Sequence, residues 1–145
     1  MSLHGSYDAD NIFAKIIRGE VPAVKVFEDD QVLAFMDVFP QSRGHVLVIS
    51  KTSQARNLLE AETKTLGRLI GAVQKVTQAV TTALKPDGVV VTQFNGAPAG
   101  QTVFHLHFHI IPRWEGDPLA KHGGGAATPG ELKLLADQIA AAWPQ

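Results

Sequence analysis

The stretch Val103-Phe104-His105-Leu106-His107-Phe108-His109-Ile110-Ile111 alternates apolar residues with histidines at a period of two, which is typical of a β-strand. Successive side chains of a strand point to opposite sides, so residues two apart lie on one side about 6.6 Å from each other. We therefore expect the imidazoles of His105, His107 and His109 to form a row on one face. The apolar residues between them need a packing partner, which we expect to be the long helix of the fold.

That helix is expected at residues 60–84, where apolar residues recur at the 3.6-residue period until Pro86 and Gly88 end the run. The other expected elements are a helix capped by Asn11, strands at residues 24–28, 32–37, 45–49, 89–95 and 103–111, and a C-terminal helix capped by Thr128. With 145 residues and 45% hydrophobic content, we expect one domain over residues 11–145, with a variable tail from about residue 114. Residues 1–10 are expected to be disordered or derived from cloning. Residues 114–128, which include three successive glycines, are expected to form a surface loop.

The composition restricts the partners of the chain. Its 13 Lys+Arg and 14 Asp+Glu give a formal net charge of -1 without a basic run, so a long nucleic acid is not expected, whereas a small nucleotide is. The absence of cysteine excludes a disulfide, a thiol nucleophile and a cysteine-ligated metal, and fits a cytoplasmic location. No window approaches the ~20 apolar residues of a membrane span, so no membrane partner is expected.

Three histidines on one face allow two chemistries. In the first they bind a metal, because His-X-His on a strand offers two zinc ligands, with His45 as a third and Asp37 as a fourth. In the second they act on a phosphate, with one ring as the nucleophile and the others orienting it and donating to oxyanions.

The loop before the strand favours the phosphate chemistry. Asn95, Gln101 and Thr102 carry neutral hydrogen-bond donors, and Gly96 and Gly100 let main-chain amides approach an anion. The same loop would also serve as an ordinary connection between two strands. Neither a P-loop lysine nor a GxGxxG fingerprint occurs in the sequence.

The stretch from Gly100 to Ile111 resembles the signature of the histidine triad family, His-φ-His-φ-His-φ-φ with φ apolar. Residues 11–23 and the segments around Phe27, Asp37 and His45 resemble the branch of histidine triad nucleotide-binding proteins, so the resemblance covers residues 11–113. It implies an α+β fold, in which an antiparallel sheet of about five strands accompanies one long helix and shorter terminal helices. It also implies a homodimer joined across the long helices.

The activity that the resemblance implies is hydrolysis or transfer at the α-phosphate of purine nucleotides, such as AMP or GMP conjugates, through a nucleotidyl-histidine intermediate. By position, His107 is the nucleophile and His109 contacts the phosphate or the leaving group. His105 and His45 would orient the nucleophilic ring through a chain of hydrogen bonds.

The resemblance also implies the residues that bind the nucleotide. Asn95, Gln101 and Thr102 would hold phosphoryl oxygens, and Asp37 would accept hydrogen bonds from the ribose hydroxyls. The residues that would enclose the base are Ile12, Phe13, Ile16, Phe35, Val38 and Leu47. Each of these six apolar residues would serve equally well as ordinary core.

The sequence departs from the family at two places. Many bacterial-type relatives have two cysteines that bind zinc together with histidines, where this chain has Asn11 and Ala14. We therefore expect no metal and no other cofactor. Thr102 stands where eukaryotic relatives often have serine; it keeps the hydroxyl, but its methyl group crowds a phosphate contact.

The leading hypothesis is a nucleoside monophosphate phosphoramidase. Enzymatic alternatives are a dinucleoside polyphosphate hydrolase and a nucleotidyltransferase. Two further classes stay open: a nucleotide-binding interaction protein with weak catalysis, and a three-histidine metal protein.

Overall fold

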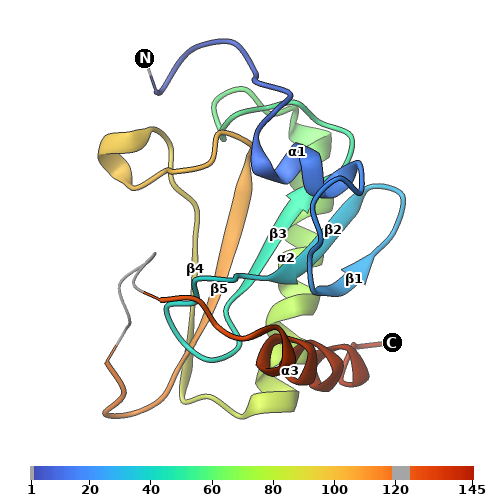
Figure 1. Ribbon diagram of the computed structural model, residues 1–145, viewed down its shortest axis with the longest axis vertical. Helices are drawn as coiled ribbons and strands as arrows, with labels where there is room; N and C mark the ends of the chain where they lie inside the picture. The colour runs from blue at the N-terminus through green and yellow to red at the C-terminus, as the bar shows by residue number, and fades with distance from the viewer. Residues whose placement is uncertain (1, 119–124) are drawn as a thin grey trace.

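The computed structural model describes residues 2–118 and 125–145, in which a five-stranded antiparallel sheet lies between helices (Figure 1). The strands are β1 (Lys25–Glu28), β2 (Val32–Met36), β3 (Val46–Ser50), β4 (Gly88–Thr92) and β5 (His107–Arg113), in the order β1-β2-β3-β5-β4. The helices are α1 (Ile12–Ile17), α2 (Thr63–Leu84) and α3 (Pro129–Ala141), with a 3-10 turn η1 (Ala97–Ala99). The expected α+β fold with one long helix is confirmed.

Side-chain caps fix the starts of both short helices. The Asn11 side chain accepts a hydrogen bond from Ala14 N at the start of α1, and the Thr128 side chain accepts one from Glu131 N at the start of α3. Helix α2 begins at Thr63, three residues later than expected, and ends at Leu84, where its C-cap Lys85 has a left-handed φ of 52°.

The two faces of the sheet pack on different helices. Helix α2 covers one face, where Leu106 and Ile110 join its apolar residues in the larger core cluster, as the alternation predicted. Helix α1 lies on the opposite face (Figure 1), where Phe13 and Ile16 meet Phe35 and other residues of β2 and β3 in a second cluster. Because both faces are covered, every residue of β2 and β3 is buried. The histidines share the α1 face.

Strand β5 is shorter than predicted, since it begins at His107 and leaves residues 103–106 outside the ladder. Its neighbour β3 ends at Ser50, where the Ser50 hydroxyl accepts hydrogen bonds from Thr52 N and Ser53 N and turns the chain away. Beyond that point β5 has no strand to pair with on this side. The prediction of a strand over residues 103–111 was therefore wrong for its first four residues.

The segment before α1 contains no helix or strand from residue 2 onward, but it contacts the rest of the chain. The Ser2 hydroxyl accepts a hydrogen bond from Ala97 N, the Leu3 carbonyl accepts one from Asn57 Nδ2, and the Tyr7 hydroxyl meets the His105 ring. We call residues 2–10 the N-terminal segment.

Two other expectations concern the tail and the membrane. Of the surface loop expected at residues 114–128, residues 119–124 lie outside the described part of the structure. Ala127 N, which follows them, donates to the Val38 carbonyl at 3.0 Å. In residues 2–118 and 125–145, no helix has both the length and the hydropathy that crossing a membrane requires.

Candidate active site

Strand pairing brings the polar residues of the site together. In the antiparallel register of β3 and β5, Leu47 lies opposite His109 and Ile49 lies opposite His107. His45 directly precedes β3 and Asp37 directly follows β2, and Asp37 N donates to the His45 carbonyl. Consequently Asp37 and three strand-associated histidines meet on the α1 face of the sheet.

Of these residues, Asp37, His107 and His109 border a cavity of about 400 Å3 between α1 and the sheet. Its wall contains all six apolar residues expected around a base, together with Asp37, Thr102, His107 and His109. It also contains residues that the sequence analysis missed: Val21, Pro22, Ala23, Met36, Phe39 and Val103. Three residues separate the end of α1 from residues 21–23. Their closeness in sequence to a helix already assigned to the site was the available signal.

The His107 ring is held by a main-chain group. Its Nδ1 lies 2.7 Å from the His105 carbonyl oxygen, which can only accept, so Nδ1 carries a proton and the lone pair of the neutral ring lies on Nε2. The Phe13 ring stands edge-on to the imidazole, with centroids 4.9 Å apart and planes at 86°. His107 is thus an oriented imidazole at the cavity wall.

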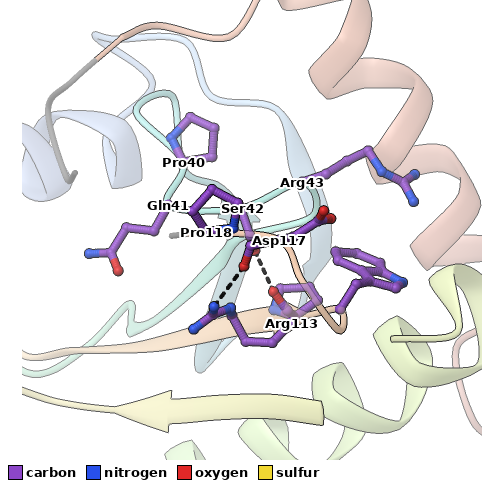
Figure 2. A pocket seen from close by; sticks show the side chains of 9 residues that line it. Pro40, Gln41, Ser42, Arg43, Arg113, Asp117 and Pro118 are labelled. Carbon is purple, nitrogen blue, oxygen red and sulfur yellow. Dashed lines mark hydrogen bonds between the residues drawn. The ribbon is translucent and has the colours of Figure 1, made fainter. Parts of the chain in front are cut away.

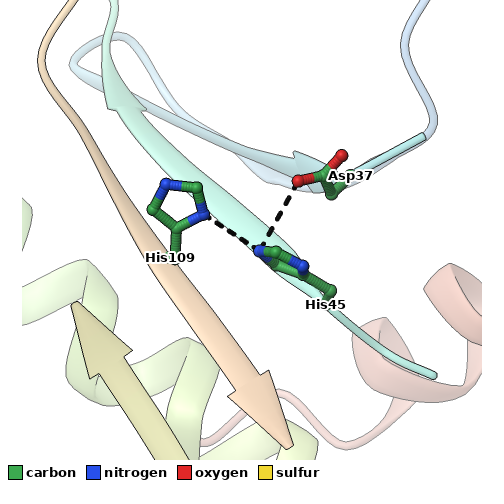
Figure 3. Close-up of side chains that lie close together, drawn as sticks. All are labelled: Asp37, His45 and His109. Atoms are coloured by element: carbon green, nitrogen blue, oxygen red, sulfur yellow. Dashed lines mark hydrogen bonds and ion pairs between the residues drawn. The ribbon is translucent and has the colours of Figure 1, made fainter. Parts of the chain in front are cut away.

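The His109 ring is held by His45. Gln41 N donates to His45 Nδ1 at 3.0 Å, so the proton of the neutral His45 ring lies on Nε2. This Nε2 lies 3.0 Å from His109 Nδ1 and 3.5 Å from Asp37 Oδ2 (Figure 3). His45 therefore donates to His109 Nδ1, and the proton of a neutral His109 ring lies on Nε2.

His105 differs from the other two histidines of the signature. Its Nε2 donates to the Ser50 carbonyl at 3.0 Å, and its Nδ1 lies 2.7 Å from the Tyr7 hydroxyl oxygen. Burial lowers the pKa of the His105 imidazole below its ordinary value, and the hydrogen bond to Ser50 opposes this shift with a smaller effect. His105 is therefore neutral and fully engaged away from the cavity.

These contacts show how His105 and His45 relate to the rings at the cavity wall. His105 holds the His107 ring through its main-chain carbonyl. The His45 ring bonds to His109 Nδ1. Residue 105 precedes β5, and its own ring is held by Tyr7 and Ser50.

The loop before β5 also departs from expectation at Gln101. Its Oε1 accepts from Gly96 N at 2.8 Å, while its Nε2 donates to the carbonyls of Arg56 and Val103. With 2% exposure and every side-chain group engaged, Gln101 braces the loop instead of offering a donor to a phosphate. Asn95 Oδ1 accepts from Leu58 N, which fixes that amide beside the loop and outside the cavity wall.

Asp37, His45 and His109 form the one group of potential metal ligands found among the described residues, with three ligand atoms within 4.8 Å of one another (Figure 3). A metal at this place needs a lone pair on His45 Nε2, but the donor Gln41 N holds the lone pair on Nδ1 and leaves the proton on Nε2. The three side chains therefore form a hydrogen-bonded group centred on His45 Nε2, and this arrangement disfavours a metal.

Zinc at the position of the family cysteines fits no better. Ala14 offers no ligand atom, Asn11 Oδ1 is used as the cap of α1, and both ring nitrogens of nearby His105 are engaged. The donor set at this place does not match the tetrahedral nitrogen and sulfur ligands that structural zinc requires.

A second cavity, of about 510 Å3, lies between residues 40–43 and residues 112–118 (Figure 2). The Ser42 hydroxyl donates to the Pro112 carbonyl across it, and Arg113 donates to the Asp117 carbonyl within one wall. None of the described residues that line this cavity is a histidine. Its role in the site is indirect, because the loop that forms one of its walls carries the Gln41 N–H that fixes His45.

Comparison with known proteins identifies relatives along most of the chain. The family model described as HIT domain matches residues 18–116. The adenosine 5'-monophosphoramidase hnt1 of Schizosaccharomyces pombe is 38% identical over 134 residues, which cover 88% of this chain and 94% of that protein.

Solved structures agree. A Hit-like protein involved in cell-cycle regulation from Bartonella henselae matches with a TM-score of 0.90 and 52% identity, covering 95% of this chain and 99% of that one. A zinc-bound histidine triad family protein from Mycobacterium smegmatis matches with a TM-score of 0.80 and 31% identity, covering 92% of both chains. The sequence signature, the fold and these matches agree, and the chain belongs to the histidine triad (HIT) family.

Proposed function

We propose that this chain hydrolyses purine nucleotides at the α-phosphorus, with nucleoside monophosphate phosphoramidates as its substrates. The observation that carries the proposal is the 2.7 Å hydrogen bond from His107 Nδ1 to the His105 carbonyl, which orients the ring and assigns the lone pair of its neutral form to Nε2, the nitrogen that attacks phosphorus. The relationship to the adenosine 5'-monophosphoramidase of S. pombe supports the choice of substrate.

The reaction takes place in two steps. A bond forms between His107 Nε2 and phosphorus while the bond from phosphorus to the leaving amine breaks, and the amine takes up a proton from solvent as it departs. Water then attacks phosphorus, breaks the bond to His107 Nε2 and gives up a proton, which releases the mononucleotide. The attacking ring is uncharged, so the negatively charged phosphate oxygens repel it less than they would repel an anionic nucleophile. His109 Nε2–H, fixed by the donor His45, donates a hydrogen bond to a phosphoryl oxygen or to the leaving atom.

The rest of the cavity accommodates the nucleoside. Its apolar wall between α1 and β2 suits the two faces of a planar base, and Ile12, Phe13 and Phe35 lie there. Asp37 lines the same cavity as His109, and its carboxylate accepts hydrogen bonds from the ribose hydroxyls. The Thr102 hydroxyl, also at the cavity wall, is a donor for phosphoryl oxygens.

The substrate class is tested with a panel of adenosine phosphoramidates, acyl-adenylates and diadenosine polyphosphates. We expect the phosphoramidate to show the largest kcat/KM. Preferred cleavage of diadenosine polyphosphates would instead indicate a polyphosphate hydrolase. Turnover of every substrate at the rate of a variant without the nucleophile would indicate a nucleotide-binding interaction protein.

We also propose that the chain works as a homodimer in the cytoplasm. Strand β4 lies at the edge of the sheet and leaves Val90 and Val91 39% and 44% exposed, while Ile70 on α2 is 54% exposed. An edge strand with exposed apolar side chains is a site of pairing between copies.

Light scattering should therefore report about twice the 15.6 kDa mass of one chain at micromolar concentration. We expect the dimer because its interface would bury Ile70, Val90 and Val91. A Val91→Lys substitution would place a charge in that interface and should shift the mass toward that of a monomer. A fully active monomer of the unsubstituted chain would contradict the dimer.

Activity should persist after dialysis against EDTA, with kcat changed by less than about twofold. The reason is that, among the residues that the structure describes, the proton on His45 Nε2 and the engaged nitrogens of His105 disfavour both candidate sets of ligands for a resident metal. The measurement is steady-state turnover before and after dialysis, alongside the metal content of the protein. Loss of turnover that added zinc restores would show that the histidines bind a metal.

A further inference from the structure

We propose that Tyr7 of the N-terminal segment is a positioning residue for the nucleophile, acting through His105 on the orientation of His107. This inference rests on the proposed function of His107, but its structural part does not depend on turnover. Tyr7 lies outside the residues 11–113 in which the sequence resembles the histidine triad family, and it does not line the cavity.

The first step of the argument is the contact itself. The Tyr7 hydroxyl oxygen lies 2.7 Å from His105 Nδ1, and the two rings lie 5.7 Å apart at 59°. His105 Nε2 donates to the Ser50 carbonyl, so in the neutral ring Nδ1 is the acceptor and the tyrosine hydroxyl is the donor. Burial keeps this ring neutral, which leaves Tyr7 as the donor on the side opposite β3.

The second step concerns what the His105 side chain holds in place. Residues 103–106 lie outside β5, so the peptide that joins His105 to Leu106 has no ladder on either side. Its N–H donates to the Ala55 carbonyl at 3.0 Å, and its carbonyl accepts from His107 Nδ1. Its two side chains also restrain this peptide: Leu106 is buried in the core, and the His105 ring is anchored between Tyr7 and Ser50.

The third step links this restraint to reactivity. The His105 carbonyl selects the tautomer of His107 with the proton on Nδ1, and this tautomer places the lone pair on Nε2. A displaced carbonyl would weaken that selection and allow the proton to occupy Nε2, where it blocks attack. Tyr7 therefore contributes to the fraction of molecules with a competent nucleophile, while the base and ribose contacts are made by other segments.

The test is Tyr7→Phe, which removes one hydroxyl and keeps the ring. We expect kcat for an adenosine phosphoramidate to fall about tenfold, the effect of one lost hydrogen bond, with the affinity for AMP changed less than twofold. In 15N NMR spectra of the imidazoles, the His105 Nδ1 resonance should shift toward that of a nitrogen without a hydrogen bond. The His107 resonances should show a larger fraction of the tautomer protonated on Nε2.

Ser2→Ala is the matched control, since it removes another hydroxyl of the same segment that bonds to Ala97 and not to a histidine. We expect this variant to keep the kcat and the His107 tautomer of the original chain. If Ser2→Ala and Tyr7→Phe lower kcat equally with unchanged tautomers, the segment has only a general structural role and the proposal is wrong.

Unchanged kcat and unchanged His107 resonances in Tyr7→Phe would likewise overturn it. The proposed function fails separately, through the absence of turnover in the original chain. In that case the tautomer of His107 in the two chains still decides whether Tyr7 positions it.

Discussion

His107→Ala should lose at least about 10³-fold in kcat for an adenosine phosphoramidate, because it removes the Nε2 atom that we propose attacks phosphorus. The other two rings of the signature are committed: His105 to Tyr7 and Ser50, and His109 Nδ1 to His45. Acid-quench mass spectrometry during turnover should find the nucleotidyl group on His107 in the original chain.

The affinity of the variant for AMP shows whether the substitution has removed only the nucleophile or has also disrupted the fold. His107→Ala should keep its affinity for AMP within a few fold, because the contacts proposed for the base and the ribose lie on other segments. His109→Ala is the matched comparison; it should slow turnover by ~10²–10⁴-fold, as expected on losing a donor to the reacting group, and still form the adduct. An adduct on His105 or His109, or full activity of His107→Ala, would contradict the mechanism.

Asp37→Ala should weaken binding of AMP about 10–100-fold and binding of the 2′,3′-dideoxy analogue far less. A hydrogen bond to a charged group contributes about 1.5–3 kcal/mol, and the dideoxy analogue has no hydroxyl to offer the carboxylate. Isothermal titration of both ligands measures the difference.

The structure adds a second role for Asp37 that calls for a control. Its Oδ1 accepts from Phe39 N at 2.8 Å, and its Oδ2 lies 3.5 Å from His45 Nε2. Asp37→Asn can keep the first of these contacts while removing the charge, so it separates ribose binding from support of the turn. Equal losses for the two ligands in Asp37→Ala would show that the residue acts only through the turn and His45.

The period-two pattern predicted the placement of the histidines that lie within β5. It did not predict where β5 begins. For His107 and His109 the alternation was sufficient, since both lie in β5 and line the cavity. For His105 it was not, because the end of β3 at Ser50 decides how far β5 can pair. A strand's length depends on its neighbour, which its own residues do not specify.

Hydrogen-bond partners were the least predictable part of the site. Gln101 has the right side chain for a phosphate contact, yet the main-chain carbonyls of Arg56 and Val103 bind its amide. Tyr7 lies in a segment without periodicity, and it meets a residue 98 positions away in the chain. Neither contact leaves a local signal, because both depend on which loops meet after the sheet has formed.

The pairing of β3 with β5 has a consequence for the time course of folding. His45 and His109 are 64 residues apart in sequence, and the whole of α2 and β4 separates them. Closing so long a loop lowers the entropy of the chain before the contact between the two rings can stabilise it. We therefore expect helix α2, which depends on local interactions, to form well before these rings meet. During refolding from denaturant, the circular dichroism of the helix should therefore recover ahead of catalytic competence, and a chain arrested between the two would be helical but inert.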